Sequence, residues 1–343
     1  SENLELIKYL ISLKIFNINN KDNDGKTILH YICESGNLEM VKYIHSLGEA
    51  HFGARDKNGK TLLHYAVESE NLELVKFLIS LDQINILAKD DSEQTLLHVA
   101  TDDSSDVSIL QYLISLNQLD INAKDKSGNT PFLNAVSDEK SQMVKYLASL
   151  PDVDIKAQNS SGDNAIHLLS KNGNLTLLTY LMSLKKKIPL KQLNSSKETP
   201  LHLACENKNL DLIKYLVSFD KIDLNSVNDD GDNLLHIACY NGNFEIVKYL
   251  VSLNKINIEQ KNDDNETILH QACYSGNLDL VKYLISLGKF DINAPNKTLE
   301  TPMHFAIKSK KLPLVKYLTT LTHSADSFKT SHGSFVVNSL LLC

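Results

Sequence analysis

Residues 61–71 read Thr61-Leu62-Leu63-His64-Tyr65-Ala66-Val67-Glu68-Ser69-Glu70-Asn71, and their opening recurs along the chain. Successive copies start 34 residues apart, with two steps of 35 residues. Self-similarity at a fixed period of this length is typical of repeat architectures, in which each unit buries its apolar face only against its neighbours. The other copies begin at Thr27, Thr95, Thr130, Asn164, Thr199, Asn233, Thr267 and Thr301.

A second block follows each copy, and its clearest form covers residues 71–81. Its apolar residues fall on one side of a helix, which predicts an amphipathic segment packed against neighbours. Ten copies can be counted, from residues 3–13 to residues 311–321. A turn precedes each first block, as in Asp56-Lys57-Asn58-Gly59, with the Asp and Gly that tight turns favour. Each unit is therefore predicted to contain a turn, a short helix, a break and a longer helix.

The repeating unit resembles the ankyrin repeat. A period of 34 residues also fits tetratricopeptide repeats, but those lack this turn and begin with Trp, which the chain does not contain. The Thr-x-Leu-His-x-Ala element, the turn before it and the Gly-Asn break after it carry the resemblance, as at Gly36-Asn37. The resemblance implies an all-α solenoid of stacked helix-turn-helix units with β-turn fingers, about ten repeats in all.

The period also divides the chain. We expect an N-terminal half repeat over residues 1–20, nine repeats over 21–321, and a degenerate C-terminal half repeat over 322–343. Gly333 keeps the register of the turn glycine, and Phe335-Val336-Val337-Asn338 falls on the Thr-x-x-His positions. An unstructured tail is the alternative for this last stretch. A chain that begins and ends within a repeat is expected to be an excerpt of a longer protein.

Two rows of chemically reactive residues are predicted to be structural. Stacked helices lie about 8–10 Å apart, too far for histidines of neighbouring repeats to share a zinc ion. The resemblance implies instead that each histidine hydrogen-bonds the next turn, and that Leu133, which replaces one of them, weakens its junction. The cysteines of the repeats alternate with small or apolar residues and form no CxxC pair, which indicates buried free thiols in a reducing, cytoplasmic compartment. The two rows are His30, His64, His98, His167, His202, His236, His270 and His304, and Cys33, Cys205, Cys239 and Cys273.

Composition argues against several functional classes. The formal net charge of −7 disfavours nucleic-acid binding. The chain contains no apolar run of about 18 residues, so no membrane span is predicted. The chain contains no phosphate-binding loop, nucleophile elbow or HExxH motif, and its Asp-rich turns lack EF-hand spacing. We therefore expect a monomer without catalytic activity, cofactor or metal. A row of lysines in the second helices is interpreted as a solvated face, with a polyanion-binding stripe as the alternative.

One candidate surface stands out in the seventh and eighth repeats. Tyrosine is enriched in interface hot spots and can hold Lys or Arg through cation–π contacts, and nearby carboxylates would attract a basic ligand. The resemblance implies that partners contact the turn tips and the exposed side of the first helix. The alternative is that these are ordinary variable surface residues and turn formers. This acidic–aromatic patch comprises Asp229, Asp230, Asp232, Tyr240, Asp263, Asp264, Glu266 and Tyr274, extended by Glu206.

The expected function is a non-catalytic scaffold that binds another protein, through a basic or extended segment, on its concave face. The alternative is a substrate-recruiting module of a larger enzyme or pathogen effector, delivered into a host cell, whose catalytic domain lies outside this chain. A mechanical linker ranks below both. The resemblance also implies asparagine β-hydroxylation as a candidate modification, at Asn19, Asn122, Asn225 and Asn293.

Overall fold

The computed structural model describes residues 17–102, 106–184, 188–219 and 222–326, together with Glu5, Lys8, Tyr9, Ile11 and Leu13. Of the degenerate half repeat predicted over residues 322–343, residues 327–343 lie outside the described residues. The chain divides into two compact units, Ser1–Ser196 and Lys197–Cys343. The described part contains eighteen helices in nine pairs. It has no β-strand, apart from an isolated β-bridge between Arg55 and Thr61.

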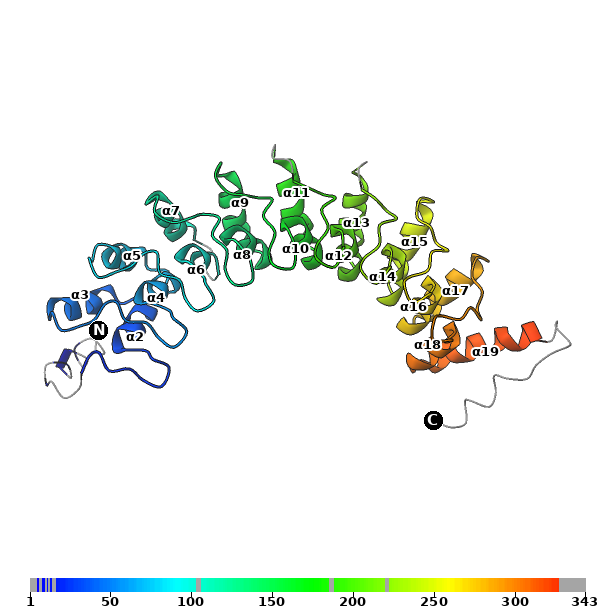
Figure 1. The fold of residues 1–343 in the computed structure, drawn as a ribbon, viewed down its shortest axis with the longest axis horizontal. Coiled ribbons are helices and arrows are strands. Elements are labelled where there is room, and N and C mark those ends of the chain that lie inside the picture. The colour runs from blue at the N-terminus through cyan, green and yellow to red at the C-terminus, as the bar shows by residue number, and fades with distance from the viewer. Residues whose placement is uncertain are drawn as a thin grey trace. The chain divides into compact units, whose positions relative to one another are not determined.

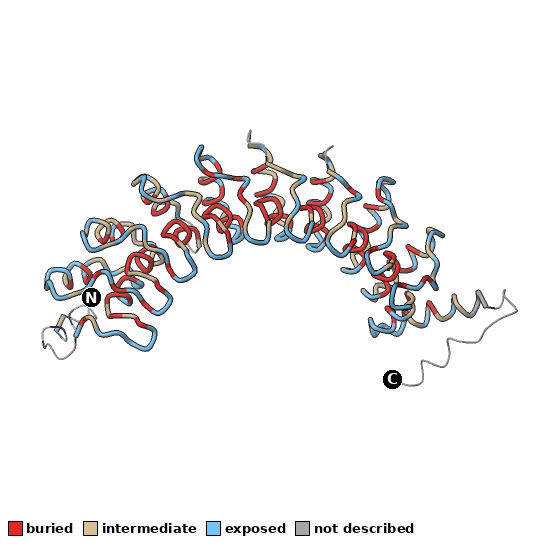
Figure 2. The backbone as a smooth tube through the Cα atoms, in the orientation of Figure 1, coloured by how far each residue is buried: buried red, intermediate tan, exposed pale blue. Residues whose placement is uncertain are grey.

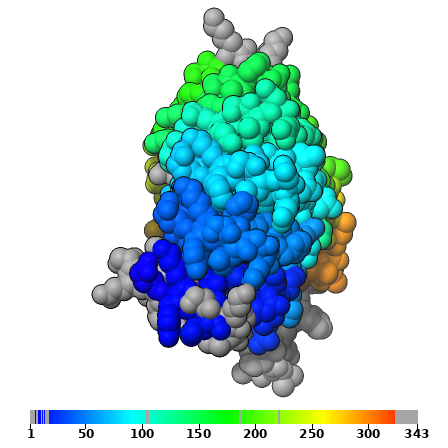
Figure 3. Space-filling model, turned by 90° about the vertical axis from the view of Figure 1, so that its left-hand side faces the viewer, coloured from blue at the N-terminus to red at the C-terminus, as the bar shows by residue number. Residues whose placement is uncertain are grey.

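In the first unit, five helix pairs are stacked so that the first helices form one row and the second helices another (Figure 1). The space-filling view shows the blue and cyan repeats lying directly against one another (Figure 3). The first helices are α2 (Ile28–Glu34), α4 (Leu62–Glu68), α6 (Leu96–Asp102), α8 (Pro131–Ser137) and α10 (Ala165–Asn172). The second helices are α3 (Leu38–Ser46), α5 (Leu72–Ile79), α7 (Ser108–Ser115), α9 (Ser141–Ser149) and α11 (Leu175–Ser183).

The second unit repeats this arrangement with four pairs. Its first helices are α12 (Pro200–Asn207), α14 (Leu234–Tyr240), α16 (Ile268–Ser275) and α18 (Pro302–Lys308). Its second helices are α13 (Leu210–Val217), α15 (Phe244–Ser252), α17 (Leu278–Ser286) and α19 (Leu312–Asp326). Helix α19 continues past residue 321, where the last full repeat was expected to end.

Each first helix begins at the recurrent Thr or Asn, and the histidine three residues later completes the cap in every one except α8, where Leu133 replaces it. In α14, the backbone N–H of Asn233 donates to His236 Nδ1, and Asn233 Oδ1 accepts from the His236 N–H at 3.1 Å. This reciprocal arrangement satisfies backbone groups that a helix start would otherwise leave unpaired. Because Nδ1 accepts a hydrogen bond, the ring proton lies on Nε2.

The Nε2 proton links one repeat to the next. His98, His202, His236 and His270 each place Nε2 within 3.0–3.2 Å of a backbone carbonyl oxygen of the following repeat. This is the role that the resemblance implied for the row. The Nε2 atoms of His30 and His64 are buried without such a partner.

Apolar residues of both helices make the core, and buried residues gather where paired helices face one another (Figure 2). Cys33, Cys205, Cys239 and Cys273 are free and have no exposed surface. Burial raises the pKa of the Cys33 and Cys273 thiols to about 12, so both remain protonated. The row is therefore part of the core, as predicted.

The turns before the first helices, called fingers here and exemplified by residues 56–60, connect in a ladder. One backbone hydrogen bond joins neighbouring fingers, as from Asp263 N–H to the Asp230 carbonyl at 2.9 Å. Gly231 has φ +74°, and an added Cβ would lie 2.6 Å from the Asp263 nitrogen. At this position a glycine avoids both the cost of the left-handed backbone and the contact with the next finger, whereas Glu93, Lys197, Asn265 and Leu299 adopt the same positive φ in other fingers.

Asparagines strengthen the same junctions from the helix side. Asn71 caps α5 by accepting from the Leu74 N–H, and its amide donates to the Gly36 carbonyl of the preceding repeat at 2.8 Å. Asn277 does the same in the second unit, with Leu280 and Gly242. A single side chain therefore both starts a helix and fixes it to its neighbour.

Candidate protein-binding surface

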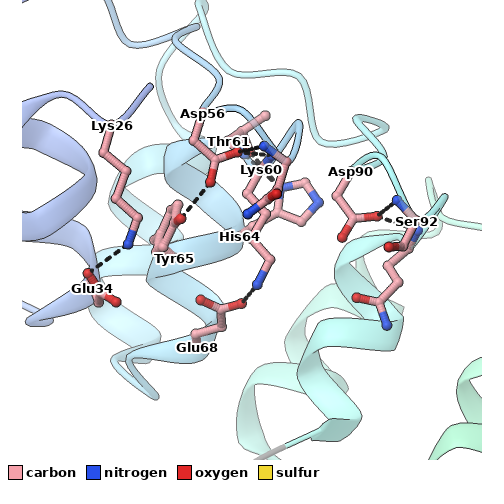
Figure 4. Close-up of polar contacts among 12 residues, drawn as sticks. Lys26, Glu34, Asp56, Lys60, Thr61, His64, Tyr65, Glu68, Asp90 and Ser92 are labelled. Carbon is pink, nitrogen blue, oxygen red and sulfur yellow. Dashed lines mark hydrogen bonds and ion pairs between the residues drawn. The ribbon is translucent and has the colours of Figure 1, made fainter. Parts of the chain in front are cut away.

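In the first unit, two variable surface positions form an ion pair where their charges are opposite. These positions are the last residue of a finger and the residue eight further on, near the end of the first helix. Lys26 Nζ lies 3.3 Å from Glu34, and Lys60 forms an ion pair with Glu68 (Figure 4). In both repeats the protein supplies a cation and an anion to one site, so the charges are neutralised internally.

Aromatic rings complete this arrangement. Lys26 Nζ lies 4.5 Å from the centroid of the Tyr65 ring, and the Tyr65 hydroxyl donates to Asp56 at 2.7 Å. Figure 4 shows Tyr65 between the Lys26–Glu34 pair and Asp56. A cation held by a carboxylate and an aromatic face is therefore a motif that this chain already uses.

The last described repeat of the second unit uses the same motif with the charges exchanged. Lys308 Nζ lies 2.6 Å from Glu300, eight residues earlier, and 4.9 Å from the centroid of the Phe305 ring. Hydrogen bonding and the charge of Lys308 hold the pKa of Glu300 below its usual value. Here the carboxylate, the ammonium group and the ring all come from one repeat.

The two preceding repeats retain the acid but lack the cation. Asp232 and Glu266 occupy the finger position, whereas Tyr240 and Tyr274 occupy the helix position eight residues later. Neither acid forms an ion pair with a described residue. Asp232 and Glu266, the acid pair, are therefore half-buried carboxylates without the counter-ion that Glu34, Glu68 and Glu300 have.

The tyrosines pack against each other instead. The rings of Tyr240 and Tyr274, the tyrosine pair, are 5.2 Å apart between centroids and inclined by only 9°. Tyr274 also makes an edge-to-face contact with Phe305, with 6.4 Å between the ring centroids. The side chains remain 51% and 42% exposed, so α14 and α16 present an aromatic surface that the described chain leaves partly open to solvent. Exposed rings of this size are characteristic of interaction surfaces.

Amide side chains bring the acid pair together. The Nδ2 group of Asn262 donates to Asp232 at 2.9 Å and to Glu266 at 3.3 Å. The two carboxylates therefore lie no farther apart than the sum of these distances. Gln271 donates to Glu266 at 2.7 Å and Asn296 donates to its other oxygen at 3.2 Å. Neutral amides orient both carboxylates but leave their negative charges uncompensated.

The environment makes ionisation of one acid unfavourable. Burial raises the pKa of Asp232 to about 6, against the lowering effect of the hydrogen bond from Asn262. The nearby carboxylates of Asp230, Glu266 and Asp264 raise it further. A strongly shifted carboxyl in such surroundings is a marker of functional sites, because a bound cation would relieve the repulsion.

The other residues of the acidic–aromatic patch have different roles. Asp229 is paired with Lys197 at 2.8 Å, so its charge is already neutralised. The backbone of Asp230, Asp263 and Asp264 forms the finger ladder, and their side chains are exposed. Glu206 is exposed near the end of α12, at the position equivalent to Tyr240. All nine predicted residues belong to the second unit, and the acid pair and the tyrosine pair form its centre.

Sequence reasoning missed the residues that arrange the acid pair, namely Asn262, Gln271 and Asn296. It also missed the ion pairs at a spacing of eight residues, although this signal is readable from the sequence at Lys26 and Glu34, Lys60 and Glu68, and Glu300 and Lys308. A comparison of the two positions across repeats would have singled out Asp232 and Glu266 as acids opposite tyrosine.

Two other kinds of feature are absent from the described residues. Across these ranges, no three His, Cys, Asp or Glu side chains are placed to hold a metal ion. No helix in this part of the chain has the length and apolarity needed to cross a bilayer.

A family model described as ankyrin repeats (3 copies) matches residues 1–90, 97–192, 166–262 and 250–329. The chain belongs to the ankyrin-repeat family. This confirms the resemblance and the all-α solenoid predicted from the sequence. A comparison with curated proteins gives no match. Ankyrin repeats generally mediate protein–protein interactions, and their fold is typically non-catalytic.

Proposed function

We propose that this ankyrin-repeat chain is a binding scaffold whose second unit holds a basic segment of another protein on the acidic–aromatic patch. The observation that supports this is the pairing of uncompensated acids with exposed tyrosines. In three other described repeats, these positions contain a lysine and a glutamate that form an ion pair next to a ring. In the repeats of Asp232 and Glu266, the proposed partner supplies that cation.

Both halves of the patch contribute to binding in different ways. Tyrosine rings provide large contact areas at a small entropic cost, and they attract cations through the ring face. The carboxylates provide long-range attraction and charge-assisted hydrogen bonds. Binding through such a patch is expected to weaken as salt concentration rises, because part of the attraction acts between solvent-exposed charges.

The first prediction concerns the tyrosine pair. The double variant Tyr240→Ala, Tyr274→Ala should lower the affinity for the partner at least about ten-fold, because two central aromatic side chains are lost. The partner is first captured from a lysate by photo-crosslinking from position 240, its crosslinked segment is identified by mass spectrometry, and the corresponding peptide is titrated by fluorescence anisotropy. We expect a segment rich in Lys and Arg.

Tyr31 provides a matched control, because it is 44% exposed on a first helix but belongs to a site that is already neutralised. Tyr31→Ala should leave the affinity unchanged. Circular dichroism establishes that the variants remain folded. Equal affinities of the parent and the double variant, or a crosslinked segment without basic residues, would show that the partner does not bind at this patch.

A further inference from the structure

The exposed face of α14 and α16 can be matched to a more specific occupant, if the proposed function holds. We infer that its main anchor is a single arginine side chain of the partner, stacked on the tyrosine pair and shared by Asp232 and Glu266. Three features of the site favour a guanidinium group over an ammonium group: the number of carboxylates, their spacing and the shape of the aromatic surface.

The number of carboxylates comes first. Where the chain neutralises one finger carboxylate, as at Glu300, one lysine is sufficient. Here two carboxylates from consecutive repeats converge on one amide nitrogen of Asn262. Two separate ammonium groups would repel each other in so small a space, whereas one cation with several donors can reach both acids. Arginine has five N–H donors in a fixed planar fork, and lysine has a compact point charge.

The spacing of the acids supports the same occupant. The amide of Asn262 is itself a planar donor, and its nitrogen lies within hydrogen-bond distance of both carboxylates. A guanidinium group placed on the solvent side of the acid pair could donate in parallel to the oxygens that the amides leave open. Such forked pairs are shorter and stronger than single contacts.

The aromatic surface completes the match. Because the tyrosine rings are stacked, with centroids 5.2 Å apart and planes inclined by only 9°, each covers one face of the other, and a guanidinium group can stack on the face of Tyr240 that points away from Tyr274. A planar guanidinium group stacks on such a surface, whereas the tetrahedral, strongly hydrated ammonium group does not. Arg55 shows how several donors of one guanidinium group are used at once, since it donates to the Gly59 and Lys89 carbonyls and also lies 3.7 Å from Asp91.

The test uses the whole chain and three fluorescent peptides of about twelve residues, which is long enough to cross both repeats. The peptides share one sequence and differ only at their basic positions, which are arginine, lysine or the neutral analogue citrulline. We expect the arginine peptide to bind at least about five-fold more tightly than the lysine peptide, and the citrulline peptide not to bind. Replacing the arginines by lysine one at a time should place most of the loss at one position.

Variants assign the preference to the acid pair. The isosteric double variant Asp232→Asn, Glu266→Gln should reduce the ratio between arginine and lysine affinities to about one. Asp211→Asn is the matched control, because it removes an exposed acid of the same unit that is paired with Lys214 and lies outside the patch. It should leave the ratio unchanged. A native circular dichroism spectrum is required of each variant.

The outcomes separate this inference from the proposed function. If the arginine and lysine peptides bind equally, or if Asp232→Asn, Glu266→Gln keeps the preference, the shared arginine is wrong while a basic partner remains supported. If neither basic peptide binds, both the inference and the basic-segment proposal are overturned. If the citrulline peptide binds as well as the others, charge is not the basis of recognition.

Discussion

The histidine three residues into each first helix has a fixed tautomer. Nδ1 accepts the cap N–H, and at His202 and His236 Nε2 also donates to the next repeat. Burial lowers the pKa of His64, His202 and His236 from 6.5 to about 4. A protonated ring would lose the Nδ1 acceptor and carry a charge into the core, so the folded state requires the neutral form.

This gives a prediction for acid stability. The unfolded chain takes up protons on these histidines below about pH 6.5, whereas the folded chain does so only near pH 4, so stability is lost as pH falls between these values. Each histidine should account for a loss on the order of 2 kcal/mol at about pH 5. Urea unfolding at about pH 7.5 and about pH 5 measures the difference.

Asp232 acts in the opposite direction, because its pKa is raised to about 6 in the folded chain. As pH falls from about 6 towards 3.8, the folded state binds a proton first and gains stability. The variant Asp232→Asn should therefore lose more stability on acidification than the parent. A stability that does not change between the two pH values would contradict the assignment of neutral, buried histidines.

The finger is the element whose geometry is most constrained. Gly231→Ala should destabilise the chain by about 2 kcal/mol or more, because the residue has φ +74° and its Cβ would collide with the next finger. Gly288 is the matched control, with φ +64° and no atom within 4 Å of the added Cβ. Gly288→Ala should cost only the conformational strain, about 1 kcal/mol.

Thermal and urea unfolding of the two alanine variants provide the measurement. The difference between them isolates the contribution of the contact between fingers, since both carry the same backbone strain. If both variants lose the same stability, the close approach of Asp263 to Gly231 is not a significant constraint on the ladder.

Sequence reasoning predicted the elements well because each depends on local signals. The capping residues, the Asp-x-x-Gly turns and the apolar spacing are all set within one period, so the helix pairs and the buried Cys row follow from the sequence. The residues of the acid pair could be predicted from the sequence, but their arrangement could not. Its geometry depends on the side chains of Asn262, Gln271 and Asn296, which come from different elements and meet only after the repeats stack. The pairing of Asp229 with Lys197 depends on the same stacking.

At the scale of the whole molecule, stability is distributed over many similar junctions. Repeat arrays approximate a sum of repeat and nearest-neighbour terms, so a local defect should stay local. Asn71→Ala removes a cap and a junction contact in the first unit, and Asn277→Ala removes the equivalent pair in the second. Each should cost about 1 kcal/mol or more.

Hydrogen exchange followed by mass spectrometry tests this locality. Asn71→Ala should accelerate exchange around α5 and its neighbours in the first unit, and Asn277→Ala should accelerate exchange around α17 in the second. The double variant should show the two effects side by side, without an additional one. Accelerated exchange throughout both units from either single change would indicate a globally cooperative array.

The buried cysteines make local opening of this molecule measurable by alkylation. An alkylating reagent reacts with the thiolate and needs access to the sulfur atom. In the folded state, Cys33, Cys239 and Cys273 are unexposed, and their raised pKa values keep the thiols protonated. Their modification rates therefore measure how often each surrounding repeat opens. Once Cys343 is replaced by serine, the alkylation rate of Cys33 reports the opening of the first unit, and the rates of the other cysteines report the opening of the second.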